Sequence, residues 1–148
     1  MPMPELSPQQ IAERVRDGML ADDRATQMMG IRIVEVAPGR AVAEMAVRDD
    51  MLNGHDLCQG GFVTMLADTA FAYACNAYNE VTVASGFTVD LIAPGHGGDV
   101  LTATCDEVGK AGRTGVYDVS VRNQRGERIA VFRGRSYTVR GKPVVNLD

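Results

Sequence analysis

One acidic side chain, Asp68, lies inside the most apolar stretch of the chain. Between Phe62 and Tyr78 most residues are apolar and neither Pro nor Gly interrupts the run, so we expect a helix buried on all sides. A carboxylate is seldom placed in such surroundings without a hydrogen-bonding partner or a function. Asp68 is therefore the first candidate for a general base or a nucleophile. The alternative is a core acid that Thr64 or the backbone satisfies.

Two glycines, Gly60 and Gly61, stand where this helix is predicted to begin. Backbone N–H groups at the positive end of a helix can stabilise an oxyanion that develops during a reaction. Tight packing of the helix start against a strand would explain the two glycines equally well. Asn53, in the preceding loop, offers an amide, although a turn is the simpler explanation for an asparagine there.

The spacing of these residues has a geometric consequence. Gly60 and Asp68 are eight residues apart on one helix, which separates them by roughly 12 Å. One carbonyl group cannot contact both. If both act on one substrate, the second residue must come from another subunit, and two antiparallel helices related by a two-fold axis would create two equivalent sites. A catalytic role for both residues thus predicts a homodimer.

Other familiar catalytic patterns are missing from the sequence. There is no phosphate-binding loop, no G-x-S-x-G and no H-E-x-x-H. His55 and His96 both fall in predicted loops, where a histidine is usually solvated. The three cysteines (Cys58, Cys75 and Cys105) are odd in number and form no C-x-x-C, which argues against disulfides and structural zinc and favours a reducing cytoplasm. Cys58 could be a nucleophile, but nothing near it in the sequence indicates a lowered pKa.

Length and charge bound the possibilities further. The 148 residues suit a single domain spanning 1–148, and a net charge of −4 argues against nucleic acid as a partner. The apolar run is too short, and too often interrupted by polar side chains, to cross a bilayer. Residues 1–107 carry 6 basic and 16 acidic side chains, whereas residues 108–148 carry 9 basic and 3 acidic ones. The basic excess is either a set of solvated strand faces or a rim for an anionic ligand such as nucleotide phosphates.

Strand-like segments surround the central helix. Ser7 and Pro8 predict the start of a first helix, and a second helical turn over 23–29 should end at Gly30. An opening pair of strands precedes the central helix and a four-strand antiparallel meander follows it, with breaks at 94–98, 109–112 and 125–126. The six segments are 31–36, 41–47, 81–92, 99–107, 112–123 and 128–139. Strands that cluster rather than alternate with helices indicate an α+β fold, and one sheet curled round the helix gives the hotdog architecture.

At the central helix the sequence resembles a known family. N-G-H at 53–55, G-G at 60–61 and L-A-D-T-A-F-A-Y-A-C-N at 66–76 are similar to hotdog acyl-CoA thioesterases of the phenylacetate degradation pathway. T-G-V-Y-D-V-S-V-R-N-Q at 114–124 and V-F-R-G-R-S-Y at 131–137 agree, so the likeness covers roughly residues 20–140. It implies hydrolysis of acyl-CoA thioesters, of the (hydroxy)phenylacetyl-CoA or related aryl-acyl type, in a homodimer that pairs into a homotetramer.

The resemblance also implies roles for individual residues. Asp68 matches the nucleophile or general base, Gly60 the glycine whose N–H polarises the thioester carbonyl, and Asn53 the amide that places water or substrate. No metal or cofactor is implied, since coenzyme A is part of the substrate. Burial beside Phe71 and Tyr73 should raise the pKa of Asp68.

Substrate-binding roles follow in the same way. Gly61 belongs to the helix start that faces the substrate, and Gln59 stands where relatives usually have a histidine, which removes a proton-transfer group but keeps a hydrogen-bonding one. Ser85 lies near a polar site of some relatives. Candidates for the pantetheine and phosphates are Lys110, Arg113 and Thr114, and more weakly Arg133 and Arg135.

Two other functions fit the same sequence. Hotdog hydratases and dehydratases share the architecture, but they usually pair the acid with a catalytic histidine, and Gln59 stands where one would be expected. A non-catalytic acyl-CoA sensor would keep the basic rim without needing a buried acid. Release of free thiol from an acyl-CoA distinguishes the thioesterase from both.

Overall fold

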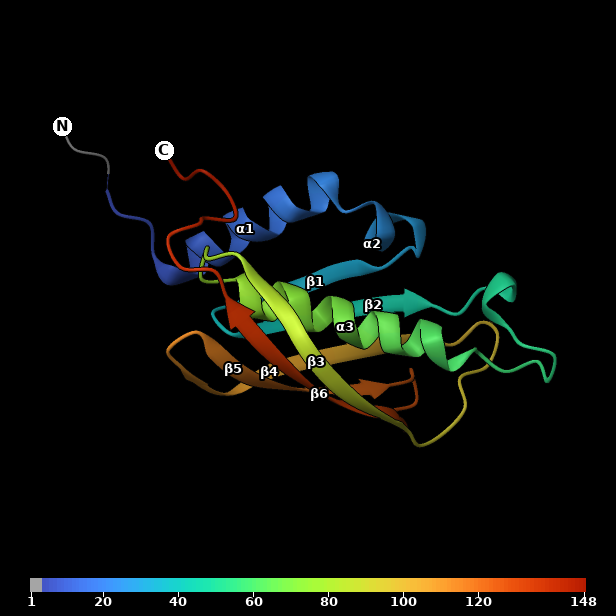
Figure 1. Ribbon diagram of the computed structural model, residues 1–148. Helices are drawn as coiled ribbons and strands as arrows, with labels where there is room; N and C mark the ends of the chain where they lie inside the picture. The colour runs from blue at the N-terminus through green and yellow to red at the C-terminus, as the bar shows by residue number, and fades with distance from the viewer. Residues whose placement is uncertain (1–3) are drawn as a thin grey trace.

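A computed structural model describes residues 4–148 as one antiparallel six-stranded sheet with helices on one side (Figure 1). The strand order across the sheet is β1-β2-β4-β5-β6-β3. The strands are β1 Arg32–Ala37, β2 Arg40–Ala46, β3 Thr82–Leu91, β4 Val100–Ala111, β5 Thr114–Arg122 and β6 Arg128–Thr138. The helices are α1 Pro8–Asp22, α2 Arg24–Met28 and α3 Gly60–Asn76, with a 3₁₀ turn η1 at Asp49–Met51.

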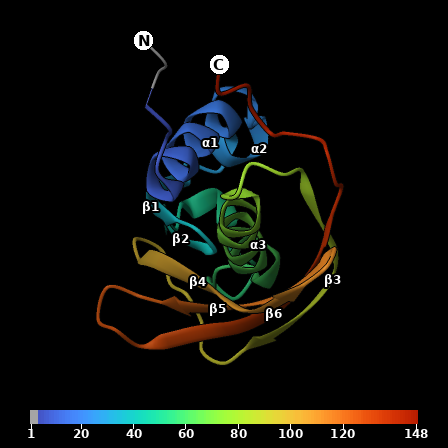
Figure 2. The same ribbon diagram turned by 90° about the vertical axis from the view of Figure 1, so that its left-hand side faces the viewer.

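The sheet curves round α3. Seen along the axis of α3, the strands wrap one side of this helix while α1 and α2 lie on the other (Figure 2). The core between α3 and the sheet is one cluster of buried apolar side chains, in which Leu66, Phe71, Leu101 and Val121 are at most 1% exposed. The predicted α+β hotdog fold is confirmed.

The amino-terminal helices form for the reasons that the sequence predicts. The Ser7 hydroxyl accepts the Gln10 N–H while the Gln10 side chain accepts the Ser7 N–H, which makes a complete capping box, and Pro8 occupies the first turn. Asp23 caps α2 in the same manner by accepting the N–H of Thr26. Gly30 follows with a φ of 66°, the left-handed conformation that favours glycine.

The predicted four-strand meander is wrong at its first strand. Only β4, β5 and β6 follow one another across the sheet, whereas β3 pairs with β6 at the far edge. The eight residues between β3 and β4 span the sheet, so β3 does not form a hairpin with its neighbour in sequence. The predicted break at 109–112 also lies partly inside β4, because a bulge between Glu107 and Gly109 lets the strand continue to Ala111.

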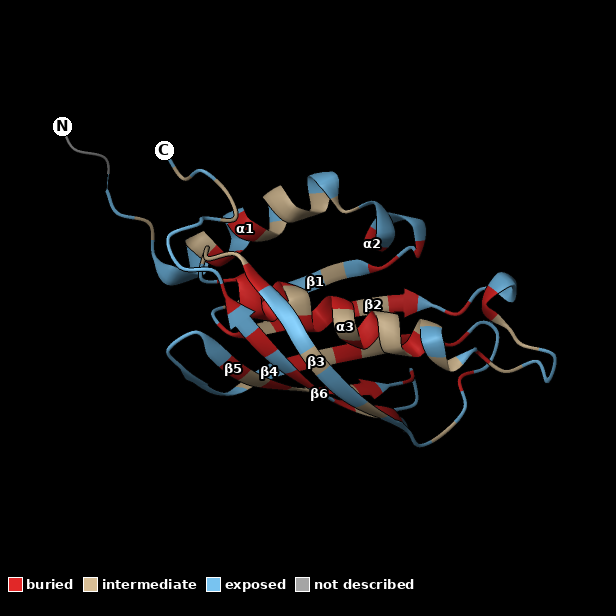
Figure 3. Ribbon diagram, in the orientation of Figure 1, coloured by how far each residue is buried: buried red, intermediate tan, exposed pale blue. Residues whose placement is uncertain are grey.

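The apolar sequence of α3 predicted a helix buried on all sides, and this prediction is wrong. Gly61 is exposed, and Thr64, Met65, Asp68 and Ala72 are only partly buried. These residues recur three or four positions apart, so they form one stripe along the helix. Figure 3 shows the same division, with the carboxyl-terminal half of α3 buried and its amino-terminal end more open. Within residues 4–148 no helix combines the length and the apolar character needed to cross a membrane.

Candidate active site

Asp68 lies in a groove of about 450 Å³ that runs along the open stripe of α3. We call it the Asp68 groove. Eleven residues of α3, β3 and the segment around α2 line it: Asp23, Ala25, Thr26, Gly61, Thr64, Met65, Asp68, Thr69, Ala72, Tyr73 and Phe87. An acid from the most apolar helix thus faces an open space rather than the core.

The Asp68 carboxylate has no hydrogen-bond partner among the described residues. The Thr64 hydroxyl, which could have satisfied it, instead donates to the Gly60 carbonyl oxygen at 2.8 Å. Burial raises the pKa of Asp68 above its ordinary value of 3.8, as the sequence predicted. A carboxylate that is half-buried, unpaired and made more basic is suited to accept a proton or to attack an electrophile.

Gly60 opens on a different cavity, of about 330 Å³, which we call the Gly60 pocket. Its lining is mostly apolar and comes from the start of α3, the loop before it and the end of β3: Asn53, Leu57, Cys58, Gly60, Val63, Leu91, Ile92, Ala93, Pro94 and Gly95. A Cβ atom on Gly60 would collide with the Leu91 side chain, whereas one on Gly61 would meet nothing within 4 Å. Tight packing against Leu91 is therefore sufficient to explain a glycine at position 60. Gly61 has no such neighbour and lies in the Asp68 groove.

Asn53 is a turn residue, and its role toward a substrate stays a prediction. Its Oδ1 accepts the backbone N–H groups of His55 at 2.9 Å and Leu57 at 3.3 Å, so it is a turn residue. Among the described residues its Nδ2 group has no acceptor. Because Asn53 also lines the Gly60 pocket, that amide can serve only as a donor there.

Most of the residues predicted to bind coenzyme A, though not Arg113, line a third cavity of about 620 Å³, which we call the basic groove. Ser85, Lys110 and Thr114 line it together, and Arg135 and Arg133 line it as well. Its lining includes no acidic residue.

Several of these polar side chains already have local partners. Arg133 forms a bidentate pair with Asp118 at 2.7 and 2.8 Å, which offsets its charge. Arg113 lies outside the lining and donates to the Tyr137 hydroxyl, and the Ser85 hydroxyl donates to the Arg135 carbonyl oxygen. Lys110 and Arg135 are thus the best cationic candidates.

The remaining candidates from the sequence have minor roles in this geometry. Gln59 is exposed at the N-cap of α3 and makes no side-chain cap hydrogen bond, so its amide is available to a ligand. Cys58, Cys75 and Cys105 are all buried and free. Burial, followed by the charge of Asp99, raises the pKa of Cys58, and burial raises the pKa of Cys75 to about 12. Neither thiol is therefore an activated nucleophile.

Sequence reasoning missed the contacts that two tyrosines make around these cavities. Tyr73 donates to Asp23 at 2.9 Å where the α2 segment meets the Asp68 groove. Lys110 stacks over the Tyr78 ring, with Nζ 4.1 Å from the ring centroid. Both tyrosines were part of an apolar run, and nothing local to them in sequence indicates partners as distant as Asp23 and Lys110.

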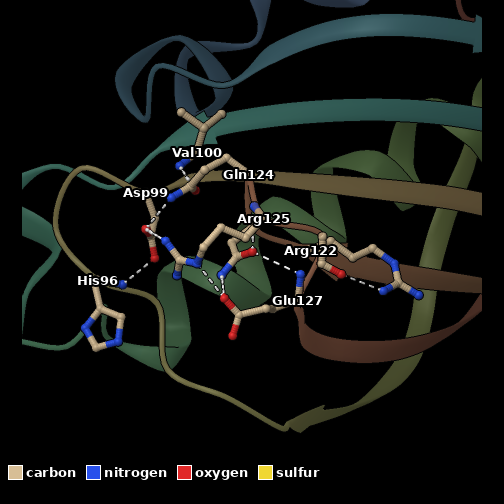
Figure 4. A network of polar contacts seen from close by, with 9 residues as sticks. His96, Asp99, Val100, Arg122, Gln124, Arg125 and Glu127 are labelled. Atoms are coloured by element: carbon tan, nitrogen blue, oxygen red, sulfur yellow. Dashed lines mark hydrogen bonds and ion pairs between the residues drawn. The ribbon is translucent and has the colours of Figure 1, made fainter.

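A buried acid, Asp99, was also missed, because the sequence placed it at the start of a strand. It is 5% exposed and lies just before β4, where it accepts the His96 N–H at 2.9 Å and the Gln124 side-chain amide at 2.8 Å (Figure 4). Arg125 approaches it at 3.8 Å. Asp99 therefore ties the β3–β4 loop, part of which lines the Gly60 pocket, to the β5–β6 turn.

The single chain does not assemble the predicted site. Asp68 and Gly61 share one cavity, Gly60 and Asn53 share a second, and Ser85, Lys110 and Thr114 share a third; the lining sets have no residue in common. Gly60 and Asp68 both belong to α3, as predicted, so their separation along the helix stands.

An antiparallel sheet that wraps a central helix defines a hotdog domain, and in this one the open stripe of the helix carries a half-buried acid. Residues 55–130 match the thioesterase superfamily, and the chain belongs to that family. The resemblance seen in the sequence is confirmed.

Individual relatives agree with this assignment. The chain is 45% identical over 123 residues to the acyl-coenzyme A thioesterase PaaI of Escherichia coli (strain K12), which covers 83% of this chain and 88% of that protein. The solved structure of the E. coli PaaI protein from the phenylacetic acid degradation operon superposes with a TM-score of 0.90 at 42% identity, over 92% of this chain and 99% of that one. A mutant of the phenylacetic acid degradation protein PaaI from Thermus thermophilus gives a TM-score of 0.76 at 34% identity, over 79% of this chain and 100% of that one.

Proposed function

We propose that this protein hydrolyses acyl-CoA thioesters to a free acid and coenzyme A. The observation that carries the proposal is Asp68, an unpaired carboxylate with a raised pKa that faces a groove in a thioesterase fold. Acting as a general base, Asp68 takes a proton from water while the water oxygen attacks the thioester carbon. The tetrahedral intermediate then collapses, the C–S bond breaks, and the sulfur of coenzyme A leaves and takes up a proton. Direct attack by the carboxylate gives the same products after hydrolysis of the resulting anhydride.

The oxyanion of that intermediate needs donors close to Asp68. The N–H of Gly60 at the start of α3 is suited to this role, and the Nδ2 group of Asn53 is a second donor in the same pocket. Along the helix, however, Gly60 and Asp68 are separated by roughly 12 Å. We therefore propose that Asp68 of one subunit works with Gly60 and Asn53 of another.

The edge of the sheet supports such a dimer. Within residues 4–148, strand β3 pairs with β6 alone, so these residues leave the backbone along its other side open. Its side chains Val83, Phe87 and Leu91 are 50%, 40% and 53% exposed. A long apolar edge strand is a place where another chain adds. Pairing of β3 with its symmetry mate would place two α3 helices antiparallel across the axis and cover the open stripe, and two such dimers would form the tetramer.

In this proposal the coenzyme A part of the substrate binds in the basic groove. The Lys110 and Arg135 side chains suit the phosphates of coenzyme A, and the Ser85 and Thr114 hydroxyls suit its polar pantetheine arm. For the acyl part we propose an arylacetyl group, because the relatives above include proteins from phenylacetic acid degradation. The three buried cysteines without a disulfide fit a reducing cytoplasm.

Release of free thiol tests this function. Phenylacetyl-CoA and a ring-hydroxylated phenylacetyl-CoA are mixed with the protein and a thiol-reactive dye, beside acetyl-CoA and an enoyl-CoA. We expect thiol release at turnover, fastest with the arylacetyl substrates. Tight binding without thiol release would indicate a sensor, and loss of the enoyl double bond without thiol release would indicate a hydratase. Either result contradicts the proposal.

A further inference from the structure

One wall of the Asp68 groove comes from outside the residues that match the thioesterase superfamily. Asp23, which joins α1 to α2, lines the groove together with Ala25 and Thr26 of α2, and we call residues 23–28 the α2 segment. All three residues lie well before residue 55, where the family match begins. Opposite them the groove is lined by α3 and by Phe87 of β3. The α2 segment thus closes a space that the sheet and α3 alone would leave open.

A buried hydrogen bond ties this wall to the catalytic helix. The Tyr73 hydroxyl on α3 donates to Asp23 Oδ2 at 2.9 Å. Asp23 in turn holds Thr26, because Oδ1 accepts the Thr26 N–H at 3.1 Å and Oδ2 accepts the Thr26 hydroxyl at 2.7 Å.

The donor of this hydrogen bond is buried. Tyr73 and Thr26 are each only 2% exposed. Burial above all, and then the neighbouring Asp23 carboxylate, raises the pKa of Tyr73 further above its ordinary value of 10. The phenol therefore stays protonated and remains a donor. Tyr73 lies five residues beyond Asp68 on α3, which places it roughly 7.5 Å, or about one and a half turns, farther along the helix axis than the catalytic acid.

We propose that the Tyr73–Asp23 hydrogen bond fixes the α2 segment as the wall that limits the size of the acyl group. The proposal rests on the proposed thioesterase function, because the thioester carbon must come to the Asp68 carboxylate. From there the acyl chain continues along the apolar part of the same groove, beside Met65, Ala72 and Phe87, until it meets Ala25 and Thr26. Tyr73 is thus a positioning residue for specificity and does not take part in the chemistry.

The test compares two tyrosines of the core. Tyr73→Phe keeps the ring and removes only the hydroxyl. Tyr117→Phe is the matched control, because Tyr117 is 1% exposed and its hydroxyl also donates to a carboxylate, Glu107, at 3.0 Å, but it lies outside the Asp68 groove. For each variant, kcat/KM is measured for acetyl-CoA, phenylacetyl-CoA and 4-phenylbutanoyl-CoA.

We expect Tyr73→Phe to raise the ratio of kcat/KM for 4-phenylbutanoyl-CoA over phenylacetyl-CoA by roughly fivefold, the factor that corresponds to one lost hydrogen bond holding the wall. Tyr117→Phe should lower thermal stability to a similar extent and leave the ratio unchanged. A second variant fills the groove from the wall itself: Ala25, exposed at its surface, becomes leucine (Ala25→Leu). Ala25→Leu should raise the ratio of kcat/KM for acetyl-CoA over phenylacetyl-CoA.

The possible outcomes distinguish a failure of the proposed wall from a failure of the proposed thioesterase function. If the wild-type protein releases no thiol from any acyl-CoA, the thioesterase proposal fails. If the wild type is active and neither Tyr73→Phe nor Ala25→Leu changes the ratios of kcat/KM between the acyl-CoA substrates, the proposal that the α2 segment limits acyl size is wrong and the thioesterase proposal stands. A shift produced instead by Val63→Ala, which enlarges the Gly60 pocket, would place the acyl group there and also overturn it.

Discussion

Asp68 and Asp99 are both removed at least in part from solvent, yet their environments are opposite. Asp99, at the edge of the β3–β4 loop, is 5% exposed and accepts two hydrogen bonds beside an arginine (Figure 4). Burial opposes its ionisation, but the Gln124 and His96 donors and the charge of Arg125 together lower its pKa. Asp68 is less buried, has no partner within the described chain, and its pKa is raised.

The difference shows which acid stabilises the fold and which is left for a reaction. A buried carboxylate with donors stabilises the structure that supplies them, and one without donors is a cost that folding alone does not explain. The partners of Asp99 all come from its own chain. We infer that those of Asp68 come from the substrate and from a second subunit.

The largest effect should follow from Asp68→Asn. This change keeps the shape of the side chain and removes the base, so turnover of phenylacetyl-CoA should fall by about 10²–10⁴-fold. Stability should be unchanged or higher near neutral pH, because an unpaired charge is removed. Thiol release and thermal unfolding measure the two effects. A variant that hydrolyses the substrate at nearly the wild-type rate would make Asp68 a plain core acid.

A second, smaller effect should appear when two inactive variants are combined. Asp68→Asn and Gly60→Val are unfolded and refolded together at equal amounts, so that about half of the dimers are mixed. In each mixed dimer one site keeps both functional residues and the other carries both lesions. We expect recovery of roughly a quarter of the wild-type activity, because an isologous interface supplies the two halves in pairs.

Two controls make this experiment decisive. Each variant refolded alone should stay inactive, and different affinity tags on the two chains should show that mixed dimers have formed. Gly60→Val must displace the Leu91 side chain, so its dimerisation is checked first by sedimentation. Verified mixed dimers with no recovered activity would mean that Gly60 and Asp68 do not meet across the interface.

The third effect concerns stability and its pH dependence. Asp99→Ala leaves the His96 N–H and the Gln124 amide without an acceptor, which should lower the free energy of unfolding by about 2–3 kcal/mol at pH 7. The pKa of Asp99 is lower in the folded state, so its contribution is present above the ordinary value of 3.8 and is lost as the pH falls through the folded-state pKa. Denaturant titrations of both proteins should therefore converge at low pH.

The same titrations should show the opposite sign for Asp68. Its pKa is raised on folding, so its contribution is fully present below the ordinary value and is lost as the pH rises through the folded-state pKa. Relative to the wild type, Asp68→Asn should become more stable as the pH rises through that range. Parallel pH profiles for Asp99→Ala and Asp68→Asn would show that the two acids do not differ as described.

Much of this protein is determined by its sequence alone. The capping box at Ser7 and the start of α3 at Gly60 depend on contacts within a few residues, and the bounds of the strands follow the local residue pattern and the turn residues between them. These predictions are confirmed to within one or two residues, except where β4 continues through Gly109 to Ala111. The family was recognisable for a related reason, because an unbroken string of residues around Asp68 carries it.

Tertiary structure decided the features that join distant parts of the chain. The place of β3 beside β6, the open stripe of α3 and the Asp99 network each depend on segments far apart in sequence, so no local pattern contains them. The apolar sequence of α3 predicted a helix covered on every side, but a local sequence pattern does not identify the elements that cover it. The stripe that contains Asp68 stays open because one sheet can wrap only part of a helix, and residues 4–148 leave the rest of α3 uncovered at the Asp68 groove.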